Sequence, residues 1–109
     1  MSRPVDSYQG YAYSKYSPKY VMFSGWVGDQ HNTVDGFKIA MENIIHSASQ
    51  NYLNFGFDIG AYKADQNTPK YLFLRWAQVG ALLPFMENGG GGKHQPWLFD
   101  EETVDIYRK

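Results

Sequence analysis

The stretch FGFDIGAY, residues 55–62, gives the clearest indication of the fold. It continues an apolar segment that starts at Tyr52 and turns polar at Asp58, a pattern typical of a buried strand that ends at the edge of a sheet. Two other carboxylates, Asp29 and Glu87, also end apolar segments, and each lies 29 residues from Asp58. A strand–helix–strand unit with parallel strands takes about 30 residues. The spacing therefore predicts three parallel strands whose carboxyl ends meet on one side.

Strands are expected at residues 20–23, 52–57 and 82–86, with helical segments between and after them. Thr33 is expected to cap the first helix and Thr68 the second, with Pro69 as the first helical residue of the second. A third helix is expected to start at Asp100. The apolar faces expected to be buried are Phe37, Met41, Ile44, Ile45 and Ala48 in the first helix and Leu72, Trp76, Val79 and Leu83 in the second.

The length of 109 residues corresponds to about three such units, whereas a closed (β/α)8 barrel takes about 250 residues. We therefore expect an α/β fold that forms one arc of a TIM barrel. Ligands bind at the carboxyl ends of parallel strands in such folds. The candidate site is thus the edge where Asp29, Asp58 and Glu87 meet.

The composition argues against several classes of function. Ten basic and eleven acidic residues give a formal net charge of −1, which argues against a nucleic-acid-binding surface or a polybasic membrane anchor. The chain contains no cysteine, so it has no thiolate nucleophile and no zinc finger. No apolar run reaches the roughly 18 residues of a membrane span, and residues 1–10 lack the pattern of a signal peptide.

Two further patterns predict no cofactor and no metal. The run GGGGKH, residues 89–94, departs from a phosphate-binding loop at both of its ends. His31, His46 and His94 lack the spacing of a helical metal site.

The Tyr-rich residues 8–20 are interpreted as a surface loop, although tyrosines beside lysines also suit stacking on a sugar or on single-stranded nucleic acid.

Asp29 stands in a setting that suits acid–base chemistry. Gly28 lets a ligand approach the backbone closely, and Trp26 offers a flat apolar face that suits a sugar ring. A carboxyl beside a large aromatic side chain is poorly solvated, as a general acid requires. The same pattern also fits an aspartate that caps a helix or forms a turn, and Asp58 has the same two interpretations.

Four segments, taken together, resemble glycoside hydrolase family 31, the α-glucosidase and α-xylosidase family. They are SRPVDS (2–7), SGWVGDQ (24–30), FGFDIGAY (55–62) and LFLRWAQVGALLPFMENG (72–89). The resemblance covers nearly the whole chain in the order found in the family. It implies that residues 1–109 are a fragment of the catalytic (β/α)8 barrel, from the end of strand five to the start of helix eight, with residues 8–20 as a loop within it.

The resemblance also implies roles for individual residues. Members of the family are retaining glycosidases with two catalytic aspartates. Asp29 matches the acid/base aspartate, and Arg3 matches an arginine that binds the sugar beside the scissile bond. Trp26 and Tyr62 match aromatic positions of the pocket, and Asp58 matches an acidic residue that shapes it.

The chain also departs from the family pattern. No segment matches the one that carries the catalytic nucleophile. Ala61 replaces a glycine, Lys70 stands where a glutamate usually opens the helix, and the run Glu87-Asn88-Gly89 replaces a sugar-contacting histidine.

These departures lead to two expectations. In the first, the protein acts on a glycoside substrate, the missing part of the barrel is its partner, and the isolated chain is inactive. In the alternative, it is a non-catalytic carbohydrate-binding or interaction protein derived from the same barrel.

Overall fold

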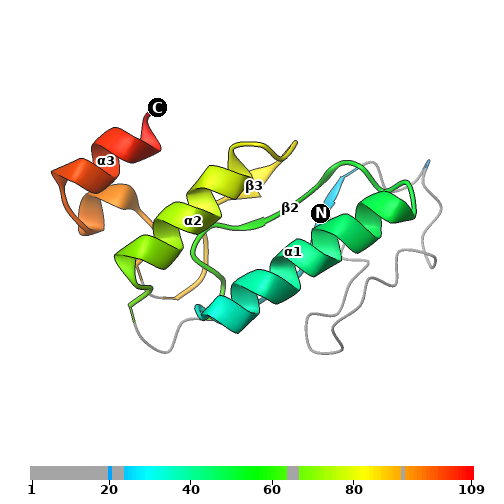
Figure 1. Cartoon of the computed structure of the whole chain (residues 1–109), viewed down its shortest axis with the longest axis horizontal. Coiled ribbons are helices and arrows are strands. Elements are labelled where there is room, and N and C mark those ends of the chain that lie inside the picture. The colour runs from blue at the N-terminus through cyan, green and yellow to red at the C-terminus, as the bar shows by residue number, and fades with distance from the viewer. Residues whose placement is uncertain (1–19, 21–23, 64–66, 92) are drawn as a thin grey trace.

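Residues 20, 24–63, 67–91 and 93–109 are described by the structure, a computed structural model. Within them, strands β1 (Gly25–Trp26), β2 (Phe55–Asp58) and β3 (Met86–Glu87) form one parallel sheet in the order β1-β2-β3 (Figure 1). Helix α1 (Val34–Ser49) joins β1 to β2, and α2 (Lys70–Gly80) joins β2 to β3. A short 3-10 helix, η2 (Pro96–Leu98), and α3 (Glu101–Tyr107) follow. The prediction of three parallel strands linked by helices is confirmed.

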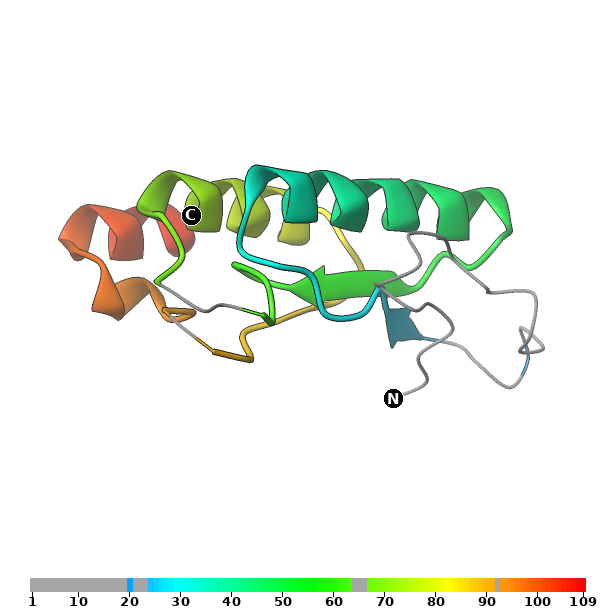
Figure 2. The ribbon, with the colours of Figure 1, turned by 90° about the horizontal axis from the view of Figure 1, so that it is seen from below.

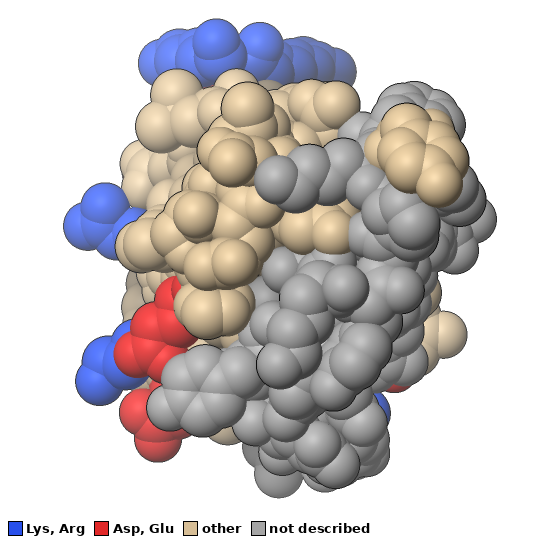
Figure 3. Space-filling model, turned by 90° about the vertical axis from the view of Figure 1, so that its right-hand side faces the viewer, with Lys and Arg blue, Asp and Glu red and all other residues tan. Residues whose placement is uncertain are grey.

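The elements form two layers. Figure 2 shows the helices in one row above the strands, so that one face of the sheet is covered by helices. The same arrangement of helices outside strands makes up the wall of a (β/α)8 barrel. In Figure 3, which looks onto the end where α1 stops, the described surface is largely uncharged, and its charged side chains, both Lys or Arg and Asp or Glu, lie at its edge. No helix of the described residues is both long enough and apolar enough to span a membrane.

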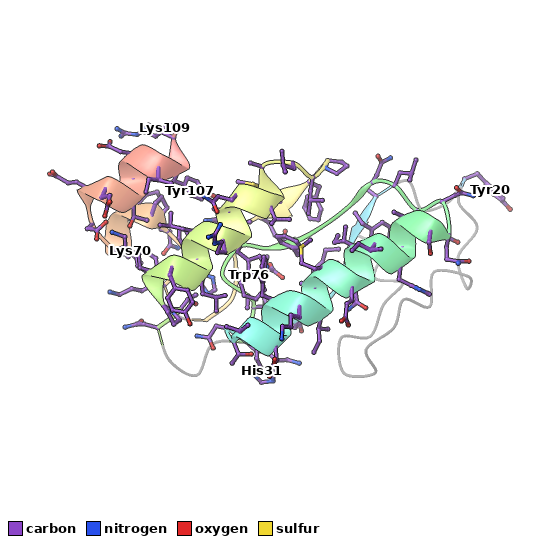
Figure 4. All side chains as sticks on the ribbon, in the orientation of Figure 1. Tyr20, His31, Lys70, Trp76, Tyr107 and Lys109 are labelled. Atoms are coloured by element: carbon purple, nitrogen blue, oxygen red, sulfur yellow. The ribbon has the colours of Figure 1, made fainter. Side chains whose placement is uncertain are left out.

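Trp76 of α2 is the centre of the core. Its side chain is fully buried and lies between the two long helices, above β2 (Figure 4). Its ring meets Phe37 of α1 edge-on at 5.0 Å between centroids and Phe57 of β2 at 6.2 Å. Edge-to-face pairs of this kind add to the gain from burial. The sequence prediction that Trp76 and Leu72 face the core is confirmed.

Helix α1 begins as predicted, and three residues of its expected apolar face, Phe37, Met41 and Ile44, are partly buried against the core. Thr33 caps it, because the Thr33 hydroxyl accepts a hydrogen bond of 3.0 Å from the Gly36 amide. However, Ile45 is 64% exposed and Ala48 is exposed, so both were wrongly placed in the core. Small or polar side chains are buried instead: Gly36, Ala40, Asn43 and Ser47. These two residues were placed wrongly because hydrophobic periodicity takes account only of apolar character. A helix that lies close to its neighbours buries the side chains that are small enough to fit.

The start of α2 also differs from the prediction. Thr68 does not cap the helix; its hydroxyl donates a hydrogen bond of 3.0 Å to the Gly60 carbonyl, while Pro69 occupies the cap position. Lys70, a cation at a helix start that opposes the helix dipole, forms ion pairs with Asp100 at 2.8 Å and Glu102 at 2.5 Å. These contacts fasten α3 to α2 and account for a lysine at this position.

The strands begin and end a few residues from their expected bounds. Of the strand expected at 20–23, residues 21–23 lie outside the described part, Tyr20 is exposed, and β1 is found at Gly25–Trp26. Leu83 lies beyond the end of α2 and is only partly buried. Asp100 caps α3 as predicted, accepting a hydrogen bond of 2.8 Å from the Thr103 amide.

Candidate active site

Three carboxylates gather at the carboxyl ends of the strands. Asp58 and Glu87 are the last residues of β2 and β3 and stand opposite each other in the sheet. The Ile59 amide donates a hydrogen bond of 2.7 Å to the Glu87 carbonyl and so continues this pairing. Asp29 follows β1 by three residues, is partly buried, and is near enough for its charge to act on Asp58. The convergence inferred from the 29-residue spacing is therefore observed.

Asp58 is the buried member of this group, with only 1% of its surface exposed. Burial, the negative charge of Glu87 and a hydrogen bond to Glu87 raise its pKa from 3.8 to about 7, and the charge of Asp29 adds to the effect. A buried carboxyl next to like charges resists ionisation, because its charged form is poorly solvated and repelled. Asp58 thus holds a proton under conditions in which ordinary carboxyls have lost theirs.

The loops after the three strands are joined into one rim by backbone hydrogen bonds. The loop after β1 pairs with that after β2, since the Lys63 amide donates to the Gln30 carbonyl at 2.9 Å and the Asn32 amide donates to the Lys63 carbonyl at 3.1 Å. The Gly91 amide donates to the Tyr62 carbonyl at 3.1 Å and connects the loop after β3. The backbones of the three loops are therefore joined to one another at the carboxyl ends of the strands.

His94 anchors the glycine-rich loop after β3. Its ring is buried, with Nδ1 3.0 Å from the Ile59 carbonyl oxygen and Nε2 in contact with the Gly91 carbonyl. Asn88 Nδ2 donates to the His94 carbonyl, and the Tyr107 hydroxyl donates to Asn88 Oδ1 at 2.9 Å. From the sequence, His94 is a candidate only for metal binding and for a phosphate loop, and a lone histidine after glycines carries no signal for this anchoring role.

The structure locates the other predicted residues as follows. Trp26 lies in β1 and is partly buried, and Tyr62 lies in the loop after β2 with 46% of its surface exposed. Both lie toward the carboxyl ends of the strands, because Trp26 is the last residue of β1 and Tyr62 follows the end of β2. Arg3 lies outside the described residues. Among the residues that are described, no group of three His, Cys, Asp or Glu side chains is arranged to hold a metal ion.

A parallel sheet with helices on one face and carboxylates at its strand ends defines the class of the protein, an α/β barrel-type fold with its site at the carboxyl edge. The sequence model of the family described as "Glycosyl hydrolases family 31 TIM-barrel domain" matches residues 17–109 of this chain. The chain belongs to glycosyl hydrolase family 31.

Curated relatives are similar over about three quarters of the chain. Alpha-glucosidase 2 of Bacillus thermoamyloliquefaciens is 28% identical over 87 residues, which are 77% of this chain and 11% of the relative. The probable glucan 1,3-alpha-glucosidase of Arabidopsis thaliana is 30% identical over 88 residues, 76% of this chain and 9% of the relative. The chain thus spans only about a tenth of the length of the curated relatives it matches.

A solved structure shares the fold. It is a mutant of Kfla1895 in complex with cyclobis-(1->6)-alpha-nigerosyl, and it superposes with a TM-score of 0.62 at 24% sequence identity. The superposition covers 76% of this chain and 13% of the other. This likeness, together with the family match, shows that the chain is a part of a TIM barrel.

Proposed function

We propose that the protein takes part in the hydrolysis of O-glycosidic bonds in α-glycosides, by a retaining mechanism with two carboxylates. The observation that carries the proposal is the position of Asp29. It follows β1 at the carboxyl edge of the sheet, next to the buried Asp58, in a chain whose curated relatives are named as α-glucosidases.

In this mechanism Asp29 protonates the oxygen of the leaving group and later removes a proton from the attacking water. A second carboxylate, about 5–5.5 Å from the first in retaining enzymes, attacks the anomeric carbon. The nucleophile segment of the family has no match in these 109 residues. We therefore propose that the chain contributes the acid/base and that the nucleophile comes from elsewhere in a complete barrel.

The remaining predicted residues bind the sugar in this proposal. Arg3 holds sugar hydroxyls through charge-assisted hydrogen bonds. Trp26 and Tyr62 form the apolar side of the pocket, and the exposure of Tyr62 leaves its ring available to a ligand. Asp58 shapes the polar side from the end of β2.

The missing part of the barrel is the proposed partner, and the arc corresponds to strands five to eight. Within the described sheet, β1 and β3 are the outer strands. Unpaired strand edges are sites for adding further strands. Leu53 and Leu82, which precede β2 and β3, are 67% and 85% exposed and provide apolar surface at the opposite end of the strands.

Hydrolysis of a panel of aryl α-glycosides by the purified 109-residue protein and by its Asp29→Asn variant tests the proposal. We expect no turnover by either. Turnover that Asp29→Asn abolishes would refute the claim that the nucleophile is missing while supporting Asp29 as the acid/base. Turnover that Asp29→Asn leaves unchanged would refute the role of Asp29.

A second candidate is a non-catalytic carbohydrate-binding protein. The absence of a segment matching the nucleophile favours it, and the exposed ring of Tyr62 beside the carboxylate rim suits stacking on a sugar. Saturable sugar binding without hydrolysis, by the folded monomer, would support this candidate. Hydrolysis once the missing barrel segments are supplied in trans would exclude it.

A further inference from the structure

We propose that Asn88 is a site of spontaneous deamidation, and that its conversion to aspartate or isoaspartate releases the glycine-rich loop after β3 from His94 and from α3. Asn88 follows Glu87, the last residue of β3, and precedes Gly89. It is the chain's only asparagine that is followed by a glycine. Such a modification acts on the loop itself and is independent of any glycoside substrate.

The position of Asn88 suits the chemistry of deamidation. The backbone nitrogen of the following residue bonds to the side-chain carbon Cγ of the asparagine, and the Cγ–Nδ2 bond breaks. The proton of the attacking nitrogen passes through solvent to Nδ2, which leaves as ammonia, and water then opens the resulting succinimide ring to aspartate or isoaspartate. Gly89 has no side chain to hinder ring closure. Asn88 is exposed, so water reaches the reacting atoms.

The other asparagines of the chain are less suited to this reaction. A β-carbon beside the attacking nitrogen restricts the backbone and hinders its approach. Residues with such a carbon follow every other asparagine, namely Asn32, Asn43, Asn51, Asn54 and Asn67. Asn54 is exposed, as Asn88 is, but is followed by phenylalanine, and it therefore serves as the matched comparison.

The side-chain amide of Asn88 joins the loop to two other segments. Its Nδ2 donates a hydrogen bond to the His94 carbonyl, and its Oδ1 accepts one of 2.9 Å from the Tyr107 hydroxyl. The His94 ring lies against the end of β2, with Nδ1 3.0 Å from the Ile59 carbonyl oxygen. The Tyr107 ring stacks on Phe73 of α2 at 5.7 Å between centroids (Figure 4). An amide serves both contacts because it carries a donor and an acceptor.

Deamidation removes the donor from this arrangement. A carboxylate only accepts hydrogen bonds, so one of its oxygens would face the His94 carbonyl oxygen and repel it. The product also places a negative charge directly after Glu87, which itself stands opposite Asp58 in the sheet. Isoaspartate in addition lengthens the main chain by one carbon at the point where β3 ends. Each change favours separation of the loop from His94.

The Gly91 amide reports whether the loop has been released. It donates a hydrogen bond of 3.1 Å to the Tyr62 carbonyl, and the Gly91 carbonyl is in contact with His94 Nε2. Both contacts lie on the far side of the loop from Asn88. Loss of the hold on His94 should therefore speed hydrogen exchange at Gly91.

The fold also sets the rate of the reaction. Ring closure requires Asn88 Cγ to turn toward the Gly89 nitrogen, but both ends of the amide are held, Nδ2 by His94 and Oδ1 by Tyr107. Tyr107→Phe removes one of these restraints and keeps the ring that stacks on Phe73. We expect this variant to lose the amide of Asn88 about threefold faster, the effect of one weak hydrogen bond.

Incubation of the purified protein at pH 8.5, followed by peptide mapping with mass spectrometry, measures the conversion of each asparagine. Asn88 should convert about tenfold faster than Asn54, and Gly89→Ala should slow its conversion about fivefold. Gly89→Ala is expected to fold, because the new β-carbon would lie 3.4 Å from Asp58 Oδ1, an ordinary contact, and Gly89 does not have a positive φ.

Hydrogen exchange tests the consequence of the modification. In Asn88→Asp, the Gly91 amide should exchange about tenfold faster than in the wild type, while the amides of α1 keep the wild-type rate. Asn54→Asp, which adds the same charge at another exposed position, should leave Gly91 unchanged. Wild-type protein aged until Asn88 has converted should match Asn88→Asp, so the test does not depend on the folding of the variant.

Each part of the proposal has its own contrary result. Conversion of Asn88 no faster than that of Asn54 would overturn the modification site. Conversion without faster exchange at Gly91 in the aged protein would overturn release of the loop. Unchanged or slower conversion in Tyr107→Phe would overturn the restraint by α3.

Discussion

Replacing Asp58 by asparagine is expected to stabilise the protein progressively as the pH rises from about 4 to 7. Asp58 is almost fully buried, and its pKa is raised from 3.8 to about 7 by burial and by the charges of Glu87 and Asp29. The neutral form of the carboxyl is therefore favoured in the folded protein. Asparagine is close in size to aspartic acid and stays neutral at every pH.

The sign and size of the effect follow from proton linkage. Between the two pKa values the folded protein binds one proton more than the unfolded chain, so the free energy of unfolding falls by about 1.4 kcal/mol per pH unit. Over the interval from 3.8 to about 7 the loss amounts to about 4 kcal/mol. The loss is absent below pH 4 and complete above pH 7.

Urea unfolding of the wild type and of Asp58→Asn at half-unit steps from pH 4.5 to pH 8 measures the difference. The difference between the two free energies of unfolding should grow with pH and level off above pH 7. Asp105→Asn, which removes an exposed carboxyl of α3, is the matched control and should follow the wild type. If the difference between Asp58→Asn and the wild type does not change with pH, the pKa of Asp58 is not raised in the folded protein.

Three further perturbations test the packing. Trp76→Ala should lower the free energy of unfolding by about 3–5 kcal/mol in urea titrations, and Trp76→Phe by less, because phenylalanine removes a buried indole N–H that has no partner. Ala61 has a φ of 75°, in the left-handed region that favours glycine, so Ala61→Gly should raise the free energy of unfolding by up to about 1 kcal/mol in the same assay. Lys70→Met should speed hydrogen exchange of the α3 amides, since both ion pairs to α3 are lost. The Lys70 ammonium lowers the pKa of Asp100 to about 2, so in the wild type α3 should stay protected at pH 4 and lose protection as the pH approaches 2.

Each of these expectations has a clear contrary result. Trp76→Ala with unchanged stability would mean that the ring is not the centre of the core. A destabilised Ala61→Gly protein would show that the lost methyl group matters more than backbone strain. Lys38→Met, which removes an exposed contact of 3.8 Å with Asp35, is the control for Lys70→Met, and equal exchange of α3 in the two variants would refute the role of Lys70.

The strand-end carboxylates were predictable because their spacing reflects topology. Parallel strands joined by helices place their carboxyl ends together, and the 29-residue spacing of Asp29, Asp58 and Glu87 carried that information directly. What the spacing did not contain was the difference between the three. Burial of Asp58 and its pairing with Glu87 depend on the register of β2 against β3, which is a property of the folded sheet.

Other features escaped prediction because a distant partner decides them. Thr68 is a residue type that often caps helices, yet its hydroxyl donates a hydrogen bond to the Gly60 carbonyl instead. A lysine at a helix start is unfavourable by itself, but Lys70 forms ion pairs with Asp100 and Glu102 at the start of α3. Ile45 fitted an apolar helical face, but the helix buries its smaller side chains. In each case the local pattern was sound and a tertiary contact overrode it.

We propose that the carboxyl edge of the sheet binds a sugar through the strand-end carboxylates. The most direct test of this binding is an NMR titration of the isotope-labelled protein with methyl α-D-glucopyranoside, in which backbone amides and side-chain carboxyls are followed together. We predict saturable shifts at Asp29, Asp58, Tyr62 and Glu87, and no shift at Leu53, near the opposite ends of the strands. Shifts that centre on Leu53, or that are absent from the three carboxyls, would show that the carboxyl edge does not bind the sugar.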